Sequence, residues 1–388
     1  MIRGILIAVT ALSLSGCAWI GGWFGGKDNS EPPTPLTEIT EEIRPQEMWS
    51  RSAGAGSGER RLALRPAVAG EFVYAAGRKG EVSAVRLDSG EQVWKVDLKA
   101  PISAGPGYGD GLVLLGTTDA RVFALRADNG ERLWEAKVST EVMAAPQAAE
   151  GVVAVHTVDG RITGLSSGDG QRLWTYDRSA PVLTLRGTSA PALAGGLVVA
   201  GFDSGHTAAL TARDGRVLWE RSIAIPSGRS ELERLVDIDA NPVIVDDVVY
   251  VTTFQGRIAA LSLERGELLW AREMSSYAAL DVGETQVFVT DDIGQVWALD
   301  RRTGATFWKQ DKLRHRAVSG PVVIGDYVVV GDLEGYLHWL SRDDGRFVGR
   351  TRADSSGIVS QPVVVDGAVV ALSNEGEISA WRLPQSTP

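Results

Sequence analysis

The 388-residue chain is poor in the residues that most often build metal and redox sites, with 1 cysteine, 4 histidines and 4 methionines. A single cysteine, Cys17, excludes an internal disulfide and any metal site that needs several cysteines. The histidines stand at positions 156, 206, 315 and 338, which is not the spacing of metal ligands. We therefore expect no metal site, and we expect His338, inside "YLHWL", to be a packed or rim residue.

Basic charge is also scarce. Lys and Arg total 39 against 49 Asp and Glu, which gives a formal net charge of -10, and no block of Lys or Arg could follow a phosphate backbone. This excludes nucleic acid as the expected partner. An acidic surface favours solubility and partners that present basic patches.

Long apolar runs are missing except at the N-terminus. There "GILIAVTALSL" follows Arg3, and small residues then lead to Cys17. The run is too short to span a bilayer and has the length and flanks of a signal peptide. We expect residues 1–16 to be a signal peptide and no other segment to cross a membrane.

The four residues that end at Cys17, Leu-Ser-Gly-Cys, resemble the lipobox of bacterial lipoproteins. This resemblance implies that Cys17 is lipidated and becomes the mature N-terminus, and Ala18 in place of Asp implies sorting to the outer membrane. The alternative is an ordinary secretory signal with an incidental cysteine. Residues 17–44 mix Gly, Pro, Thr and acids without a period, which predicts a flexible tether.

Tryptophan and glycine, by contrast, are abundant, at 12 and 45 residues, and they recur at a fixed offset. A turn glycine lies four residues before Trp94, Trp134, Trp174, Trp219, Trp270 and Trp308, and a seventh copy has Gly349 at the Trp position. Alternating apolar and polar residues on both sides of each turn indicate strands. The tryptophans are expected to pack between sheets rather than to carry chemistry.

The repeat predicts an all-β fold. Four short strands in each period of about 40 residues are typical of one β-propeller blade. An eighth copy stops before its Trp strand, and "RPQEMWSR" around Trp49 supplies a strand of that kind near the N-terminus. We expect an eight-bladed β-propeller of four-stranded antiparallel blades over residues 45–384, closed by the N-terminal strand, with a tail at 385–388.

Enzyme chemistry is not expected. The "ALDRRTGATFW" copy resembles the Trp motif of the PQQ-dependent dehydrogenase superfamily. Such an enzyme would need a Ca²⁺ site of Glu, Asn and Asp oxygens, often with vicinal cysteines. No catalytic motif is present, and acidic pairs such as Asp246-Asp247 fall at turns, where they serve as turn formers. We expect no catalytic residue and no cofactor; a PQQ-dependent, quinoprotein-like periplasmic enzyme is the alternative.

Two consecutive connections between repeats are enlarged. The spacing from the Trp to the Pro that opens the next repeat is 12 residues after Trp94 and Trp134 and 13 after Trp308, but 17 after Trp174 and 23 after Trp219. It is also 17 after Trp49, where the Gly/Ser-rich sequence "SRSAGAGSGER" predicts a slack loop. Both enlarged connections join the outermost strand of one blade to the innermost strand of the next, so they should emerge on one face as neighbours. Loops on a rigid frame commonly carry function.

The first enlarged connection contains Leu183, Leu185 and Arg186 in "PVLTLRG", and the second contains Asp237 and Asp239. Apolar anchors beside an arginine and paired carboxylates are typical of a protein-binding patch. In the second connection, "SELE" at 230–233 has the pattern of a helix capping box. The alternatives are leucines that fill a gap between blades, or an internal ion pair of Arg186 with an aspartate.

Beyond the repeat, "LTLRGTSAP", "SELERLVDIDANP" and "GDLEGYLHWLSRDDGRF" resemble the BamB family of outer-membrane assembly lipoproteins over essentially the whole mature chain. The resemblance implies that Leu183, Leu185, Arg186, Asp237 and Asp239 bind the periplasmic POTRA region of BamA. Val236 stands where the family can have Ser. It also implies a non-catalytic, lipid-anchored scaffold on the periplasmic face of the outer membrane.

The implied partners are BamA and the other lipoproteins of the β-barrel assembly (BAM) complex, with nascent outer membrane proteins as further candidates. The implied role is to assist the folding and insertion of β-barrel proteins into the membrane. A further alternative is a propeller scaffold associated with the cell wall or with exopolysaccharide, which would differ from the BAM interpretation only in its partner.

Overall fold

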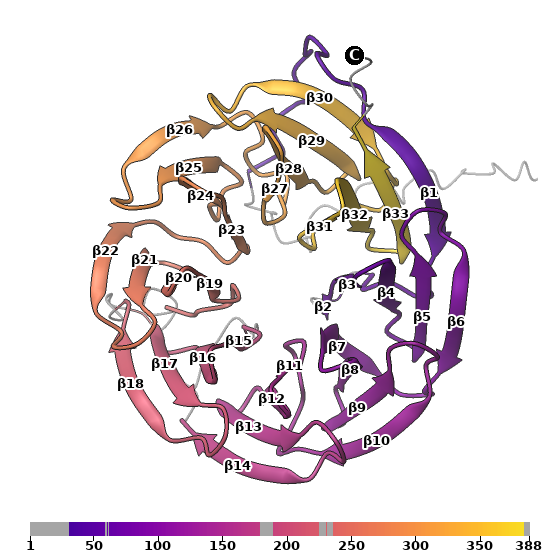
Figure 1. The fold of residues 1–388 in the computed structure, drawn as a ribbon. Coiled ribbons are helices and arrows are strands. Elements are labelled where there is room, and N and C mark those ends of the chain that lie inside the picture. Colours follow the sequence, from indigo (N-terminus) through magenta and orange to yellow (C-terminus); the bar gives the residue numbers. More distant parts are fainter. Residues whose placement is uncertain are drawn as a thin grey trace, which may run out of the picture. The chain divides into compact units, whose positions relative to one another are not determined.

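The computed structural model describes residues 31–58, 60, 62–178, 189–224, 230 and 236–383. The chain divides into two compact units, Met1–Pro32 and Pro33–Pro388. In the second unit the described residues form strands and no helix, and the strands build eight sheets that are arranged as blades around a ring (Figure 1). The predicted eight-bladed β-propeller is confirmed.

Each blade has four antiparallel strands, called A to D from the hub outward. Blade 1 consists of β3 (Ala67–Ala69), β4 (Phe72–Ala76), β5 (Glu81–Arg86) and β6 (Gln92–Asp97), and blade 2 of β7 (Ile102–Gly109), β8 (Leu112–Thr117), β9 (Arg121–Arg126) and β10 (Arg132–Lys137). Blade 3 consists of β11 (Gln147–Ala149), β12 (Val152–His156), β13 (Arg161–Ser166) and β14 (Arg172–Asp177), and blade 4 of β15 (Ala192–Ala194), β16 (Leu197–Gly201), β17 (His206–Thr211) and β18 (Val217–Ser222).

The remaining blades follow the same order. Blade 5 consists of β19 (Val243–Val245), β20 (Val248–Thr252), β21 (Arg257–Ser262) and β22 (Leu268–Glu273), and blade 6 of β23 (Leu280–Val282), β24 (Gln286–Thr290), β25 (Val296–Asp300) and β26 (Thr306–Gln310). Blade 7 consists of β27 (Val322–Ile324), β28 (Tyr327–Gly331), β29 (Tyr336–Ser341) and β30 (Phe347–Arg352), and blade 8 of β31 (Val363–Val365), β32 (Ala368–Leu372), β33 (Glu377–Arg382) and β1 (Gln46–Ser52). A short strand near the hub, β2 (Ala63–Leu64), pairs in parallel with β7.

The ring closes as the repeat predicts. Strand β1, from the N-terminal end of the propeller, pairs antiparallel with β33 from the C-terminal end, and Trp49 lies opposite Ala380 (Figure 1). Blade 8 is therefore held by backbone hydrogen bonds between segments that are far apart in the sequence.

Burial follows the position of a strand in its blade. The middle strands, such as β4 and β5, are buried along most of their length because adjacent blades cover both faces of each sheet. The outermost strands alternate, and β6 buries only Trp94. Each D strand except that of blade 7 thus contributes one tryptophan to the contact with the next blade.

The repeated tryptophans join successive blades, as expected from the sequence. The indole Nε1 of each donates a hydrogen bond of 2.7–2.9 Å to a backbone carbonyl oxygen at the C–D turn of the following blade. The pairs are Trp49 with Leu87, Trp94 with Ala127, Trp134 with Ser167, Trp174 with Ala212, Trp219 with Leu263, Trp270 with Arg301, and Trp308 with Arg342.

The repeated turn glycines accept these indoles. Gly130, for example, has φ of +74°, and a Cβ placed on it would lie 2.6 Å from the Cε3 atom of Trp94 in the preceding blade. At all seven turns such a Cβ would lie 2.4–2.7 Å from an indole atom. Glycine is needed here both for the left-handed backbone and for the close approach of the ring.

Blade 7 departs from this arrangement. In blade 1 the D-strand Trp94 lies opposite the small C-strand residue Ala84, but in blade 7 Gly349 lies opposite Trp339. The large residue has moved to the middle strand, where Trp339 is fully buried and its Nε1 has no hydrogen-bond partner. Trp339 therefore replaces the volume of the missing D-strand indole but not its hydrogen bond.

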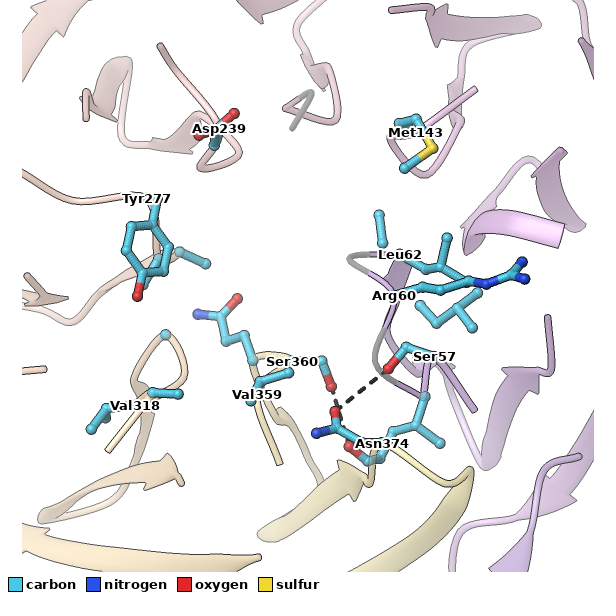
Figure 2. A pocket seen from close by; sticks show the side chains of 18 of the residues that line it. Ser57, Arg60, Leu62, Met143, Asp239, Tyr277, Val318, Val359, Ser360 and Asn374 are labelled. Atoms are coloured by element: carbon cyan, nitrogen blue, oxygen red, sulfur yellow. Dashed lines mark hydrogen bonds between the residues drawn. The ribbon is translucent and has the colours of Figure 1, made fainter. Parts of the chain in front are cut away.

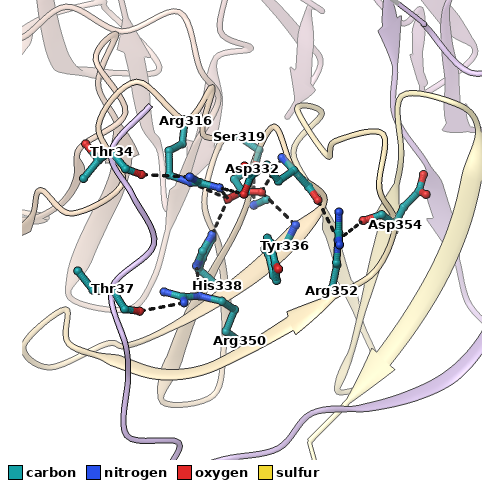
Figure 3. Close-up of polar contacts among 12 residues, drawn as sticks. Thr34, Thr37, Arg316, Ser319, Asp332, Tyr336, His338, Arg350, Arg352 and Asp354 are labelled. Carbon is teal, nitrogen blue, oxygen red and sulfur yellow. Dashed lines mark hydrogen bonds and ion pairs between the residues drawn. The ribbon is translucent and has the colours of Figure 1, made fainter. Parts of the chain in front are cut away.

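The N-terminal segment Thr34–Ile43 runs along blade 7, and it belongs to the same compact unit as the propeller although the sequence placed it in the tether. Arg316 donates a 3.0 Å hydrogen bond to the carbonyl oxygen of Thr34, and Arg350 donates one of 3.0 Å to that of Thr37 (Figure 3). A tether over the preceding residues stays a prediction.

A buried polar cluster supports these two arginines. Asp332, whose side chain is fully buried, accepts hydrogen bonds of 2.9 Å each from Arg316 Nε and from Nε2 of His338 (Figure 3). The other ring nitrogen of His338 accepts a 3.1 Å bond from Arg350. His338 is thus a packed residue, one of the two environments expected for it, and the cluster connects blade 7 to the N-terminal segment.

Candidate functional site on the D-to-A face

The connections from each D strand to the next A strand lie on one face of the propeller, which we call the D-to-A face. Of the residues predicted to bind a partner, Asp237 and Asp239 are described and belong to the connection between blades 4 and 5. Leu183, Leu185 and Arg186 lie outside the described residues, as do Cys17 and most of the predicted capping box.

The segment that carries the two aspartates is fixed between the B–C turns of blades 4 and 5. Ile238 is fully buried, and a Cβ added to Gly201 of blade 4 would meet its Cγ2 at 2.3 Å. On the other side, the backbone NH of Phe254 in blade 5 donates a 2.8 Å hydrogen bond to the carbonyl oxygen of Asp237. The backbone here is positioned by both neighbouring blades.

Because Ile238 points into the core, the two aspartates leave the backbone in other directions. Asp237 is fully buried, whereas Asp239 is half-buried and lines the opening at the hub. Each has polar partners within the chain. Two carboxylates therefore belong to one segment that is held by both neighbouring blades.

The structure adds a third carboxylate that the sequence analysis did not single out. Asp203, in the B–C turn of blade 4, is 8 % exposed. Burial and the negative charges of Asp237 and Asp239 raise the pKa of Asp203 to about 8. An alignment of the eight B–C turns would have placed Asp203 beside the connections on this face, but its sequence context resembles that of any turn aspartate.

The hub opens on this face as a cavity of about 520 Å³. Most of its lining comes from six D-to-A connections, with Leu62, Met143, Tyr277, Val318 and Val359 among the apolar side chains (Figure 2). Tyr277 and Val359 are also among the more exposed apolar residues of the chain, at 41 % and 44 %. An apolar opening with a few polar side chains, here including Asp239 and Arg60, is typical of a surface that binds another protein.

Among the described residues that line this cavity, Asp239 is the single carboxylate, and Gln361 and Asn374 are the amides. Both amides donate hydrogen bonds to backbone carbonyl oxygens. Calcium-assisted quinone binding needs several carboxylate and amide oxygens, and the described lining supplies few of them. Over the part of the chain that the structure describes, no group of three His, Cys, Asp or Glu side chains is placed to hold a metal ion. Within the same residues, no helix is long and apolar enough to cross a membrane.

These features define a class: an eight-bladed propeller with PQQ-type repeats whose Trp residues join the blades and whose D-to-A face carries an apolar opening beside Asp239. The model of the family described as outer membrane protein assembly factor BamB matches residues 78–310. The chain is 51% identical to the protein of that name from Pseudomonas aeruginosa over 373 residues, covering 96% of this chain and 97% of the relative. It is 38% identical to the Escherichia coli protein of that name over 383 residues, covering 96% of each. The chain belongs to the BamB family.

Solved structures agree with this assignment. The crystal structure of BamB from Moraxella catarrhalis has a TM-score of 0.79 at 27% identity and covers 87% of this chain and 100% of that one. A europium-containing methanol dehydrogenase has a TM-score of 0.70 at 15% identity and covers 87% of this chain and 84% of that one. This second likeness concerns the fold alone.

Proposed function

We propose that the chain is a non-catalytic scaffold lipoprotein of the BAM complex that assists the folding and insertion of β-barrel proteins. Family membership supports this role, since relatives that match along nearly the whole length are named outer membrane protein assembly factors. Lipid on Cys17 would be the chain's attachment to the membrane, holding it at the periplasmic face of the outer membrane.

The D-to-A face is the proposed binding surface for the POTRA region of BamA. The observation that carries this proposal is the acidic segment Asp237–Asp239, held by two blades beside an apolar opening. Leu183, Leu185 and Arg186 belong to the adjacent connection and would supply apolar anchors and a forked donor. Rigid placement of the carboxylates lowers the ordering cost of binding.

The test is co-purification of BamA with the chain carrying Arg186→Ala or Asp239→Asn. A matched control is Asp366→Asn, because Asp366 is exposed and lies in an A–B turn, on the other side of the disc from the D-to-A connections. We expect both site variants to lose BamA and the control to keep it. Equal recovery of BamA with the wild type and both site variants would contradict the site.

A second role, contact with nascent outer membrane proteins, is favoured by the outer rim. Leu268 and Leu269 on β22 and Phe307 on β26 are 59 %, 52 % and 54 % exposed. In the described sheets these D strands pair on one side only, so their outer edges could accept an added strand. Photocrosslinkers at these positions should capture unfolded barrel substrates; capture of BamA alone would contradict this role.

Scaffolding requires no catalytic group. The competing proposal, a quinoprotein-like enzyme, predicts that the purified chain binds PQQ with Ca²⁺ and reduces an electron acceptor. We expect neither in spectroscopic titration and dye-reduction assays, and a positive result in both would contradict the scaffold assignment.

A further inference from the structure

Asp203 occupies the second position of the B–C turn in blade 4. In the other seven blades the backbone NH at this position donates a hydrogen bond to the connection that arrives from the preceding blade. These bonds join Arg78 to Ala55, Thr118 to Pro101, Val158 to Glu141, Phe254 to Asp237, Asp292 to Ser275, Leu333 to Arg316, and Asn374 to Gly357. For blade 4 the arriving connection is the enlarged one that contains Leu183 and Arg186.

By its position in the repeat, Asp203 is therefore the turn residue equivalent to those that bond the arriving connection in the other blades. It also lies beside the second enlarged connection, because the NH of Ile238 donates a 3.4 Å hydrogen bond to the carbonyl oxygen of Phe202, the residue before Asp203. Burial and the charges of Asp237 and Asp239 accordingly raise the pKa of Asp203.

The carboxylate of Asp203 is unusual in being both buried and unsatisfied. Its residue is 8 % exposed, and its Oδ1 atom is buried without a hydrogen-bond partner. The aspartates in the B–C turns of blades 2 and 3 are satisfied: Asp119 accepts from Thr117 and Arg121, and Asp159 accepts from Thr157. A buried acceptor without a donor is costly unless a ligand supplies one.

Within the described part of the chain, the groups around Asp203 do not supply that donor. On its own turn, the Nδ1 atom of His206 is bonded to Ser204. Arg178 stacks over the ring of Phe202 at 6.0 Å and is paired with Glu220. The turn of blade 5 presents Phe254 and Gln255, which carry no charge, and the segment between the blades presents Asp237 and Asp239. The charges that act on the Asp203 carboxylate are both negative.

We propose that Asp203 is a third carboxylate of the BamA-binding surface and that, together with Asp237 and Asp239, it accepts an arginine side chain of the partner. The proposal rests on the proposed function. A guanidinium group has five donors in a planar fork and can bond to more than one carboxylate at once. It would satisfy the buried Oδ1 atom and favour the ionised form of Asp203.

Proton linkage gives this pairing a signature. Free Asp203, with a pKa of about 8, is mostly protonated at pH 7. A bound cation favours the ionised form and lowers the pKa, so binding must release a proton. The affinity should therefore rise with pH below 8, by up to about tenfold per pH unit, and level off above it.

The experiment is calorimetric titration of full-length BamA in detergent with the full-length chain, in phosphate and in Tris at pH 7 and at pH 8.5. The difference in heat between buffers counts the protons released. The variant is Asp203→Asn, which keeps the shape of the side chain but cannot ionise, and Asp366→Asn is the matched control. We expect the wild type and the control to release a proton at pH 7. We expect Asp203→Asn to release none and to bind about tenfold more weakly at pH 8.5.

Each other result is decisive. Wild-type affinity and proton release in Asp203→Asn would overturn the inference while leaving BamA binding intact. Failure of the wild type to bind BamA would overturn the proposed function and this inference with it. Thermal melting separates a structural role: we expect Asp203→Asn to melt at or above the wild-type temperature, and a clear drop that accompanies weaker binding would assign Asp203 to the fold instead.

Discussion

Ile43 lies against Gly349, at the position where the other blades carry the D-strand tryptophan. The NH of Ile43 donates a 3.0 Å hydrogen bond to the carbonyl oxygen of Val348, and a Cβ added to Gly349 would lie 2.9 Å from Ile43 Cγ1. The reason is the closure of the ring. A D-strand indole needs the C–D hairpin of the next blade, but blade 8 takes its D strand, β1, from the other end of the chain and has no such hairpin.

We therefore expect Ile43→Ala to destabilise the propeller at blade 7. Ile43 is half-buried, so the loss in unfolding free energy should be about 1–2 kcal/mol. The measurement is urea unfolding followed by tryptophan fluorescence. Leu268→Ala is a control with an equally large aliphatic loss at a 59 % exposed site, where a change within about 0.5 kcal/mol is expected. Equal effects of the two substitutions would contradict the role of Ile43.

Two glycine substitutions can separate the steric effect of the indole contact on stability from the cost of a left-handed backbone. Gly130 and Gly111 have nearly the same φ, +74° and +73°, but a Cβ meets Trp94 at 2.6 Å in the first case and nothing within 4 Å in the second. Both alanine variants should lose about 1–2 kcal/mol for the left-handed backbone. Gly130→Ala should lose about 1–3 kcal/mol more by overpacking, measured by urea unfolding. A Gly111→Ala loss as large as that of Gly130→Ala would refute the steric role of the indole.

The sequence predicts the frame of the molecule because the frame is periodic. The Trp and Gly positions, the closing strand around Trp49 and the insertion before Asp237 all follow from spacing. The partner of each Trp does not, since Gly130 lies four residues before Trp134 in the chain but receives Trp94 in space. Contacts between blades depend on the curvature of the ring, which spacing does not encode.

The predicted site is similarly divided. Asp237 and Asp239 could be selected because insertions interrupt a regular repeat. Asp203 could not, because other B–C turns also carry an aspartate, such as Asp119 and Asp159, and the donors that satisfy those two are seen only in the structure. The blade 7 cluster was also inaccessible to sequence reasoning: Thr34 and Arg316 are bonded across 282 residues.

The blade 7 cluster predicts that Arg316 stabilises the propeller and holds the N-terminal segment on it. Its side chain is 3 % exposed and pairs with Asp332, whose side chain is fully buried, at 2.8 Å. Arg316→Met would leave the charge of Asp332 without this partner, at a cost of about 3–5 kcal/mol in unfolding free energy. It would also remove the hydrogen bond to Thr34, so a protease that cuts after glutamate should cleave at Glu38 faster.

The matched control is Arg352→Met. Arg352 is an exposed arginine on β30 of the same blade; its hydrogen bonds go to backbone oxygens at 3.3 Å, and its guanidinium lies 5.3 Å from the ring centre of Tyr336. It should leave both stability and the rate of cleavage near wild type. Equal cleavage rates for the two variants would mean that Arg316 does not hold the N-terminal segment.

Stability should also fall in mild acid through His156. Burial lowers the pKa of His156 to about 4, although its Nδ1 atom lies 3.0 Å from the carbonyl oxygen of Ser189. The unfolded chain binds this proton near pH 6.5, so the unfolded state holds more protons between pH 6.5 and 4 and stability drops as pH falls through that window. The loss is about 3 kcal/mol when complete.

In His156→Gln this contribution is absent, so its stability relative to the wild type should improve by about that amount from pH 7 to pH 4. His206→Gln, which removes a half-buried histidine, controls for the loss of a ring, and a wild-type advantage over His156→Gln that is the same at both pH values would contradict the prediction.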